Sequence, residues 1–132
     1  MIALDTNVLV RLLVKDDDNQ HQKVLRMLQK GIEQGTTYFI PDVVVVELVW
    51  VLGSRYRYNR DEIGMALKAM FETEHLAFES VDRCRRALLR FRSSKGGFAD
   101  YMIVECAKDA GCTSTATFDK ALLDSDDFEE PS

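Results

Sequence analysis

The chain has 132 residues, of which 46% are hydrophobic and 30% are charged, and its formal net charge is −5. This composition is typical of one folded domain with a real core and excludes a disordered chain. The negative charge excludes a molecule that attracts nucleic acid over its whole surface, so any RNA contact requires a local basic patch or bridging cations.

The expected cellular compartment is inferred from the targeting segments and cysteine motifs that the sequence does not show. The first residues have no basic segment followed by a long apolar run, so we expect no signal peptide. The longest apolar block, Val43–Leu52, is interrupted by Glu47 and is too short to span a membrane. The three cysteines, Cys84, Cys106 and Cys112, form no CxxC pair. We therefore expect reduced, mostly buried thiols, no zinc site and a cytoplasmic protein.

Strands and helices alternate in the first part of the chain. Residues Ile2–Asp5 are predicted to form a strand, and Val8–Val14 a short helix. A longer helix follows and ends near Gly31 to Gly35, with one apolar side made of Val24, Leu25, Leu28 and Ile32. The segment Thr37–Ile40 is predicted to be a second strand, ended by Pro41.

The next segment, PDVVVVELVWVLGSRY, has two interpretations. Four consecutive valines favour a strand, because their branched side chains are stiff at χ1. The length of the segment, a proline at a plausible first helical position and Gly53 near the end favour a helix. We predict a mostly buried helix, with Trp50 in the core.

The alternation continues to the C-terminal region. A helix is predicted over Arg60–Glu72, a strand over Leu76–Glu79, a helix over Phe98–Ala110 and a strand over Cys112–Ala116. Between them, a further helix is indicated by the apolar stripe of Val81, Cys84, Leu88 and Phe91. The pattern predicts a single α/β domain with a parallel sheet over residues 1–132.

Four carboxylates stand out by position. Asp5 ends the first predicted strand and Asp119 follows the last, and ligands bind at that edge of open parallel sheets. Asp100 falls in the first turn of its helix, at the border of the apolar face. Glu47 interrupts an apolar block, so if it is buried it requires an arginine, a lysine or a metal.

Each acid also has a structural explanation, as a helix cap, a turn residue or half of an ion pair. Carboxylates that converge repel one another unless cations neutralise them, and oxygen ligands suit Mg²⁺ or Mn²⁺. Such a site activates water and stabilises a transferring phosphoryl group. Thr6, Asn7 and Thr117 are placed to hydrogen-bond the carboxylates.

Four segments, in order from about Ile2 to Leu123, resemble the PIN-domain family, with the closest likeness to VapC-type toxin ribonucleases of type II toxin–antitoxin systems. They are MIALDTNVLVRLL, the block around Glu47, GGFADYMIVECAKDAG and TATFDKAL. The resemblance implies a three-layer α/β/α fold with a short central parallel sheet. It also implies an endoribonuclease that uses Mg²⁺ or Mn²⁺, a structured RNA substrate such as tRNA or rRNA, a cognate antitoxin and a homodimer.

The family's acidic quartet corresponds to Asp5, Glu47, Asp100 and Asp119, which the resemblance implies as catalytic residues and metal ligands. Its polar residues near the first and last acids correspond to Thr6, Asn7 and Thr117. One departure is visible, because many relatives carry a fifth acid where this chain has Gly97. The chain also ends soon after the last motif, so we expect a short or missing final strand.

Basic residues crowd the segment before Asp100, and the candidates for RNA contact are Arg85, Arg86, Arg92 and Lys95. The alternative is the solvated face of an amphipathic helix. His21 and His75 are expected to be ordinary surface residues. Two other functions remain open: a receiver-type phosphoacceptor domain and a catalytically silent PIN-like interaction domain. The receiver reading lacks an acceptor aspartate, because Val49–Asn59 contains no carboxylate.

Overall fold

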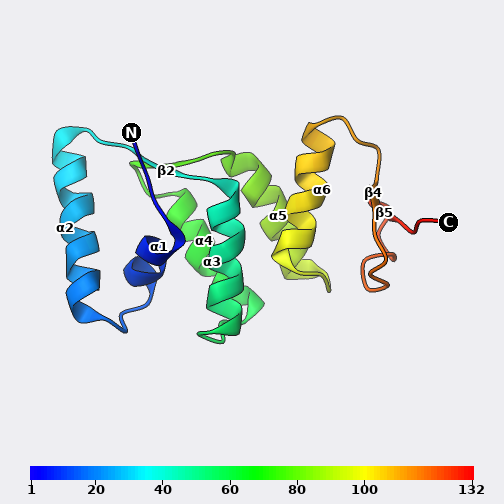
Figure 1. Ribbon diagram of the computed structural model, residues 1–132, viewed down its shortest axis with the longest axis horizontal. Helices are drawn as coiled ribbons and strands as arrows, with labels where there is room; N and C mark the ends of the chain where they lie inside the picture. The colour runs from blue at the N-terminus through cyan, green and yellow to red at the C-terminus, as the bar shows by residue number, and fades with distance from the viewer. The chain divides into compact units, whose positions relative to one another are not determined.

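Three short parallel strands organise the N-terminal part of the chain in the computed structural model, which describes all of residues 1–132 (Figure 1). The strands lie in the order β1-β2-β3, and Tyr38 of β2 pairs with Ile2 on one side and Leu76 on the other. Their bounds are Ile2–Ala3 for β1, Tyr38–Ile40 for β2 and Leu76–Phe78 for β3. The predicted α/β class with a short parallel sheet is confirmed.

The chain divides into two compact units, Met1–Val81 and Asp82–Ser132. The prediction of one PIN-like nuclease domain over 1–132 stays a prediction. No helix combines the length and the apolar character that crossing a membrane requires.

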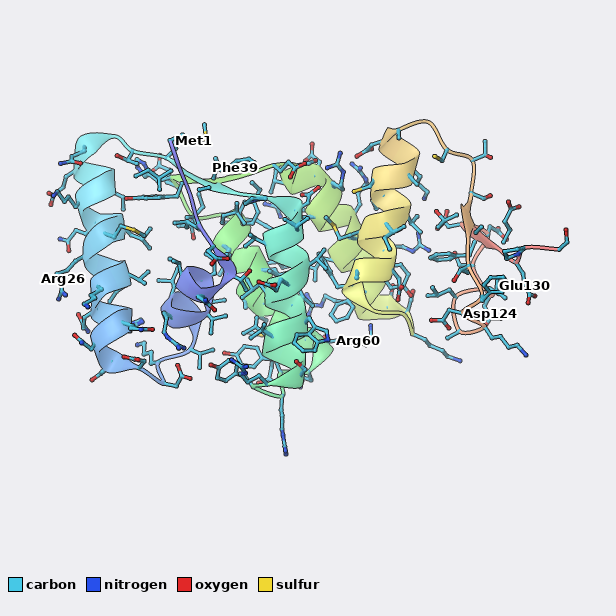
Figure 2. The ribbon with its side chains drawn as sticks, viewed as in Figure 1. Met1, Arg26, Phe39, Arg60, Asp124 and Glu130 are labelled. Atoms are coloured by element: carbon cyan, nitrogen blue, oxygen red, sulfur yellow. The ribbon has the colours of Figure 1, made fainter.

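Four helices belong to the first unit: α1 (Thr6–Leu13), α2 (Asp18–Gln34), α3 (Asp42–Ser54) and α4 (Arg60–Phe71). Helix α1 packs against α2 and α3, and α4 packs against α3 and β3. Leu9, Leu48 and Leu67, from three of these helices, are completely buried. Arg26 lies on the outer side of α2, away from this core (Figure 2).

The valine-rich segment is helical, as predicted, but only one side of α3 is covered. Val45, Leu48 and Leu52 are fully buried, whereas Val43 is 75% exposed and Trp50 is 70% exposed. The predictions of a mostly buried helix and of Trp50 in the core are therefore wrong. Positions 43, 47 and 50 share one side of the helix, and an all-apolar stretch does not reveal which side its neighbours cover.

Two predictions about polar side chains are also wrong. His21 is not a surface residue, because it is only 5% exposed and its Nδ1 lies 2.7 Å from the Arg11 carbonyl oxygen at the end of α1. The thiols are not mostly buried, because Cys84 is buried but Cys106 and Cys112 are exposed.

The second unit contains α5 (Val81–Ser93), which begins at the last residue of the first unit, and α6 (Phe98–Asp109). Two short strands follow, β4 (Thr115–Ala116) and β5 (Phe128–Glu129), and they pair in parallel. The final strand is thus present and short. The predicted stripe of α5 is confirmed at Cys84, Leu88 and Phe91, which are buried.

Ion pairs join α5 to α6. Arg83 Nε lies 2.9 Å from Asp109 Oδ2, and Arg86 binds both Asp109, at 2.9 Å, and the buried Glu105, at 3.3 Å. The hydrogen bond from Arg83 and the charges of both arginines hold the pKa of Asp109 below its ordinary value, against the effect of desolvation. Arg90 of α5 pairs with Asp127, so three basic residues of α5, namely Arg83, Arg86 and Arg90, hold the second unit together.

The contact between Gly31 and Tyr38 yields the first testable prediction. A Cβ on Gly31 would lie 2.1 Å from Tyr38 Oη, which donates to the Met27 carbonyl at 2.9 Å. Tyr38 is only 2% exposed, so its ring has little room to move. We expect Gly31→Ala to lower the free energy of unfolding by about 1–3 kcal/mol in urea denaturation, although alanine favours helices.

The control is the same change in a Tyr38→Phe background, which removes the nearest clashing atom. The loss caused by Gly31→Ala should be smaller there. A Gly31→Ala protein as stable as the wild type would contradict the predicted clash.

Asp127 yields a prediction about pH. Burial raises the pKa of Asp127, but hydrogen bonds from Lys108 and Arg90 and their charges outweigh it and leave the pKa below the ordinary 3.8. A lowered pKa adds stability above the unfolded-state pKa, and this stability is lost as pH falls through the folded-state pKa. Asp127→Asn should therefore cost about 1 kcal/mol of unfolding free energy near neutral pH.

The measurement is urea denaturation of both proteins from pH 7 down through the acid range. The difference between wild type and Asp127→Asn should shrink below about pH 4, where the wild-type carboxyl also becomes neutral. A difference that does not change with pH would show that the charge of Asp127 is not its cause.

Candidate functional site

Asp5 sits two residues beyond β1 and caps α1. It is exposed, and its Oδ1 accepts a 2.7 Å hydrogen bond from the backbone N–H of Thr6. Asp5 thus has the helix-cap role that was its structural explanation. Only one carboxylate oxygen is used, however, and Oδ2 remains without a hydrogen-bond partner.

Thr6 carries an unusual hydroxyl. The residue is 3% exposed, and its Oγ1 is buried without a hydrogen-bond partner. A buried hydroxyl left unpaired costs free energy, so this atom is an exception among the buried polar groups of the chain. Asn7, by contrast, is exposed.

Glu47 lies in the middle of α3 and is exposed. The argument that it must be paired because it is buried therefore does not apply. It makes no ion pair or hydrogen bond, and it shares the exposed side of α3 with Val43 and Trp50. Because α1 packs against α3, Asp5 and Glu47 stand on neighbouring helices.

Asp100 is half-buried in the first turn of α6, as predicted. Its Oδ2 accepts a 2.8 Å hydrogen bond from the backbone N–H of Gly97, which is the residue that precedes the helix. Gly97 has no side chain that could cap the helix. The carboxylate of Asp100 therefore reaches back to the start of its own helix.

Asp119 follows β4 and is exposed. Its Oδ1 accepts a hydrogen bond of 3.0 Å from the Ala121 N–H, and its own N–H donates to Thr117 Oγ1 at 3.0 Å. Thr117 was expected to bind the carboxylate, but its hydroxyl holds the backbone of Asp119. Ala121 contributes through its backbone N–H alone. Its residue type therefore gave no sign of this contact in the sequence.

The four acids are divided between the units, with Asp5 and Glu47 in the first and Asp100 and Asp119 in the second. Neither unit alone gathers three His, Cys, Asp or Glu side chains that could hold a metal ion. The roles of Asp5, Glu47, Asp100 and Asp119 as metal ligands therefore remain predictions.

The donor set nevertheless fits a hard divalent cation. All four candidate side chains offer oxygen, and Asp5, Asp100 and Asp119 each keep one oxygen without a hydrogen bond. The unpaired hydroxyl of Thr6, next to Asp5, is a further oxygen suited to a ligand or to a water bound to one.

The candidate RNA contacts differ from one another. Arg86 is engaged in the ion pairs with Asp109 and Glu105. Arg85 and Lys95 are exposed, and Arg92 is half-buried. None of the four is excluded as an RNA contact.

Two comparisons with known proteins bear on this site. The model of the PIN domain family matches residues 2–127. A protein described as "VapC ribonuclease", from Aquifex aeolicus (strain VF5), is 25% identical over 118 residues. The match covers 89% of this chain and 87% of that protein.

The buried hydroxyl of Thr6 gives a testable prediction. Thr6→Val removes the unpaired polar atom while keeping the shape, so the free energy of unfolding should stay the same or rise by up to about 1 kcal/mol. Thr6→Ser is the matched control, because it keeps the hydroxyl and loses a buried methyl group, which should cost about 0.8 kcal/mol. Thermal and urea denaturation measure both. A valine variant less stable than the serine variant would show that the hydroxyl has a partner.

Proposed function

The chain belongs to the PIN-domain family, and we propose that it is a Mg²⁺- or Mn²⁺-dependent endoribonuclease that acts as the toxin of a toxin–antitoxin pair. The likeness to the VapC ribonuclease supports the ribonuclease and toxin roles. Because the chain belongs to the PIN-domain family, the alternative of a receiver-type phosphoacceptor domain no longer applies.

One observation carries the proposal most directly. Three aspartates, Asp5, Asp100 and Asp119, each have one oxygen held by a backbone N–H and the other without a hydrogen bond. A carboxylate fixed in this way loses little further freedom when it binds a cation. A cap or turn contact uses only the first oxygen, so the second oxygen of each aspartate is available to a cation.

In the proposed site, Asp5, Asp100 and Asp119 bind the metal, and Glu47 joins them directly or through water. A divalent cation bound there supplies an activated water and stabilises negative charge on the phosphodiester. The backbone N–H of Thr6 orients the first acid, a supporting role is proposed for Asn7, and Thr117 fixes the turn that presents Asp119. Arg85, Arg86, Arg92 and Lys95 are proposed to contact the RNA backbone.

The proposed partners are a structured RNA of the tRNA or rRNA class, an antitoxin and a second copy of the chain, all in the cytoplasm. Exposed apolar side chains on the helices of the first unit support contacts with proteins. They include Val43 and Trp50 on α3, and Met65 on α4, which is 68% exposed.

The test is cleavage of purified tRNA and rRNA with Mg²⁺, Mn²⁺ or EDTA. Asp100→Asn should lower the cleavage rate by about 100-fold or more, because it weakens a proposed metal ligand. Asp126→Asn is the matched control, since Asp126 is an exposed acid of the same unit without an ion pair. Its rate should remain that of the wild type.

A second readout does not depend on activity. Millimolar Mg²⁺ should raise the melting temperature of the wild type and of Asp126→Asn, and raise it less in Asp100→Asn, because it binds the folded state. Equal cleavage in EDTA, or full activity in Asp100→Asn, would overturn the metal-dependent nuclease. Metal binding without cleavage of any RNA would favour the catalytically silent PIN-like domain.

A further inference from the structure

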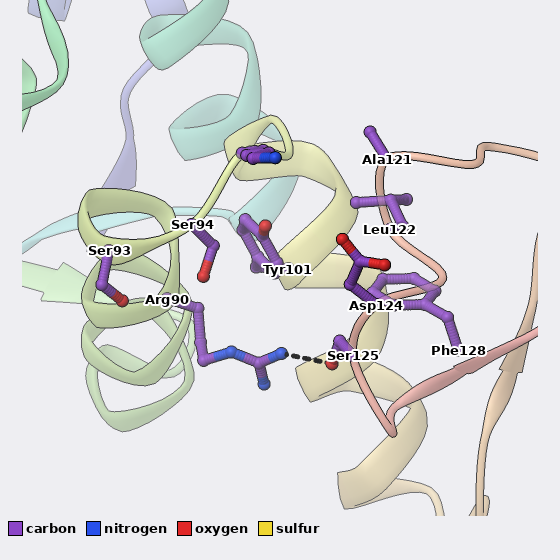
Figure 3. A pocket seen from close by; sticks show the side chains of 10 residues that line it. Arg90, Ser93, Ser94, Tyr101, Ala121, Leu122, Asp124, Ser125 and Phe128 are labelled. Atoms are coloured by element: carbon purple, nitrogen blue, oxygen red, sulfur yellow. Dashed lines mark hydrogen bonds between the residues drawn. The ribbon is translucent and has the colours of Figure 1, made fainter.

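We propose that a pocket in the second unit binds one nucleotide of the RNA next to the cleaved bond and selects guanine there. The inference rests on the proposed ribonuclease function and adds a substrate-selecting site to it. The pocket has a volume of about 260 Å³ and is open on one side (Figure 3). Pockets for drug-sized ligands have volumes of roughly 300–1,000 Å³. The slightly smaller volume of this pocket suits a single base and sugar.

The wall on the α5 and α6 side is held in place. Tyr101 is 3% exposed, and its hydroxyl accepts a 2.8 Å hydrogen bond from the Gly96 N–H, which fixes the loop between the helices. The Arg90 guanidinium lies 5.3 Å from the centre of the Tyr101 ring and donates to Ser125 Oγ at 3.0 Å. Because these groups are already ordered, a ligand meets a preformed surface.

The opposite wall comes from the segment between β4 and β5, where Asp124 lies (Figure 2). The buried Phe128 closes this side, so aromatic rings of Tyr101 and Phe128 both line the space. Together with Ala121 and Leu122, these rings give the pocket an apolar wall beside its polar groups. A nucleobase, which has an apolar surface and polar edges, therefore matches this lining better than a bare anion.

The polar groups indicate which base. The carboxylate of Asp124 faces the pocket in Figure 3 and has no hydrogen-bond partner. Its two oxygens match the two neighbouring N–H donors on the Watson–Crick edge of guanine, in the manner of other bidentate carboxylate contacts. The Ser94 hydroxyl and the Lys95 ammonium, which also line the pocket, are donors suited to the guanine carbonyl or to a phosphate.

Two residues that line the pocket are close in the chain to the proposed catalytic acids of the unit. Tyr101 directly follows Asp100 in the chain, and Ala121, whose N–H holds Asp119 Oδ1, is part of the wall. The proposal places the neighbouring phosphate of a bound nucleotide on the side of these carboxylates. The pocket would determine which phosphodiester is presented for cleavage.

The first test is binding of 5′-GMP, 5′-AMP, 5′-CMP, 5′-UMP and inorganic phosphate to the whole chain in EDTA, followed by NMR shifts and calorimetry. GMP should bind most tightly and should shift the resonances of Tyr101 and Phe128. Asp124→Asn should weaken GMP binding about tenfold and remove the preference for it. Equal affinity for all four nucleotides, or for phosphate alone, would overturn the proposal.

A blocking variant separates the pocket from a general effect on folding. Ala121→Phe puts a large ring into the wall of the pocket and should abolish GMP binding, with circular dichroism and melting temperature checking that the protein is folded. Ile103→Phe adds a similar ring to α6 at a residue that is 55% exposed and does not line the pocket. This control should bind GMP like the wild type. GMP binding retained in folded Ala121→Phe would place the ligand elsewhere and overturn the proposal.

The last measurement separates this inference from the proposed function. With RNA substrates, Asp124→Asn should raise KM at sites next to guanine about tenfold and leave kcat within about twofold, because it removes binding rather than chemistry. Cleavage without guanine-selective binding would overturn the pocket and keep the nuclease. Guanine-selective binding without cleavage of any RNA would overturn the nuclease and the placement beside a cleaved bond. Loss of antitoxin binding in Ala121→Phe with unchanged GMP binding would assign the pocket to protein contacts instead.

Discussion

Backbone N–H groups hold one oxygen of each of the three proposed aspartate ligands, and much of the structure around them depends on these contacts. For Asp5 and Asp100 the donor lies at the start of a helix, and for Asp119 it lies in the turn after a strand. The contact satisfies N–H groups that these elements leave unpaired, so the acids stabilise the elements that carry them. Cap and ligand are therefore compatible roles, because each uses a different oxygen.

The same contacts connect the acids to their surroundings in the second unit. The turn that presents Asp119 also positions Ala121 in the pocket wall, and the residue after Asp100 supplies the Tyr101 ring. Ion pairs of α5 and α6 with Asp109 and Asp127 hold this scaffold together. A basic helix in an acidic protein is thus used largely for internal pairing, which leaves fewer cations for RNA than the sequence suggested.

Local patterns were sufficient for most of the fold and for the position of the candidate acids. The stripe of Cys84, Leu88 and Phe91, the helix after Pro41 and the parallel strands all follow from periodicity and length. Predictions that depended on burial by other elements failed at Trp50, His21 and Cys106. Whether such a side chain is covered depends on the packing of neighbouring elements, and composition does not contain that information.

The sequence by itself determined the α/β alternation, the likeness to PIN domains and the placement of Asp5, Asp100 and Asp119 at the starts or ends of elements. These features are local, because caps and strand ends are set by residues a few positions apart. Only the tertiary structure decided that Glu47 is exposed, that Thr6 buries an unpaired hydroxyl and that Tyr101 and Phe128 share a pocket. Those properties arise where segments distant in the chain meet, and their physical cause is packing between elements rather than the preference of any one of them.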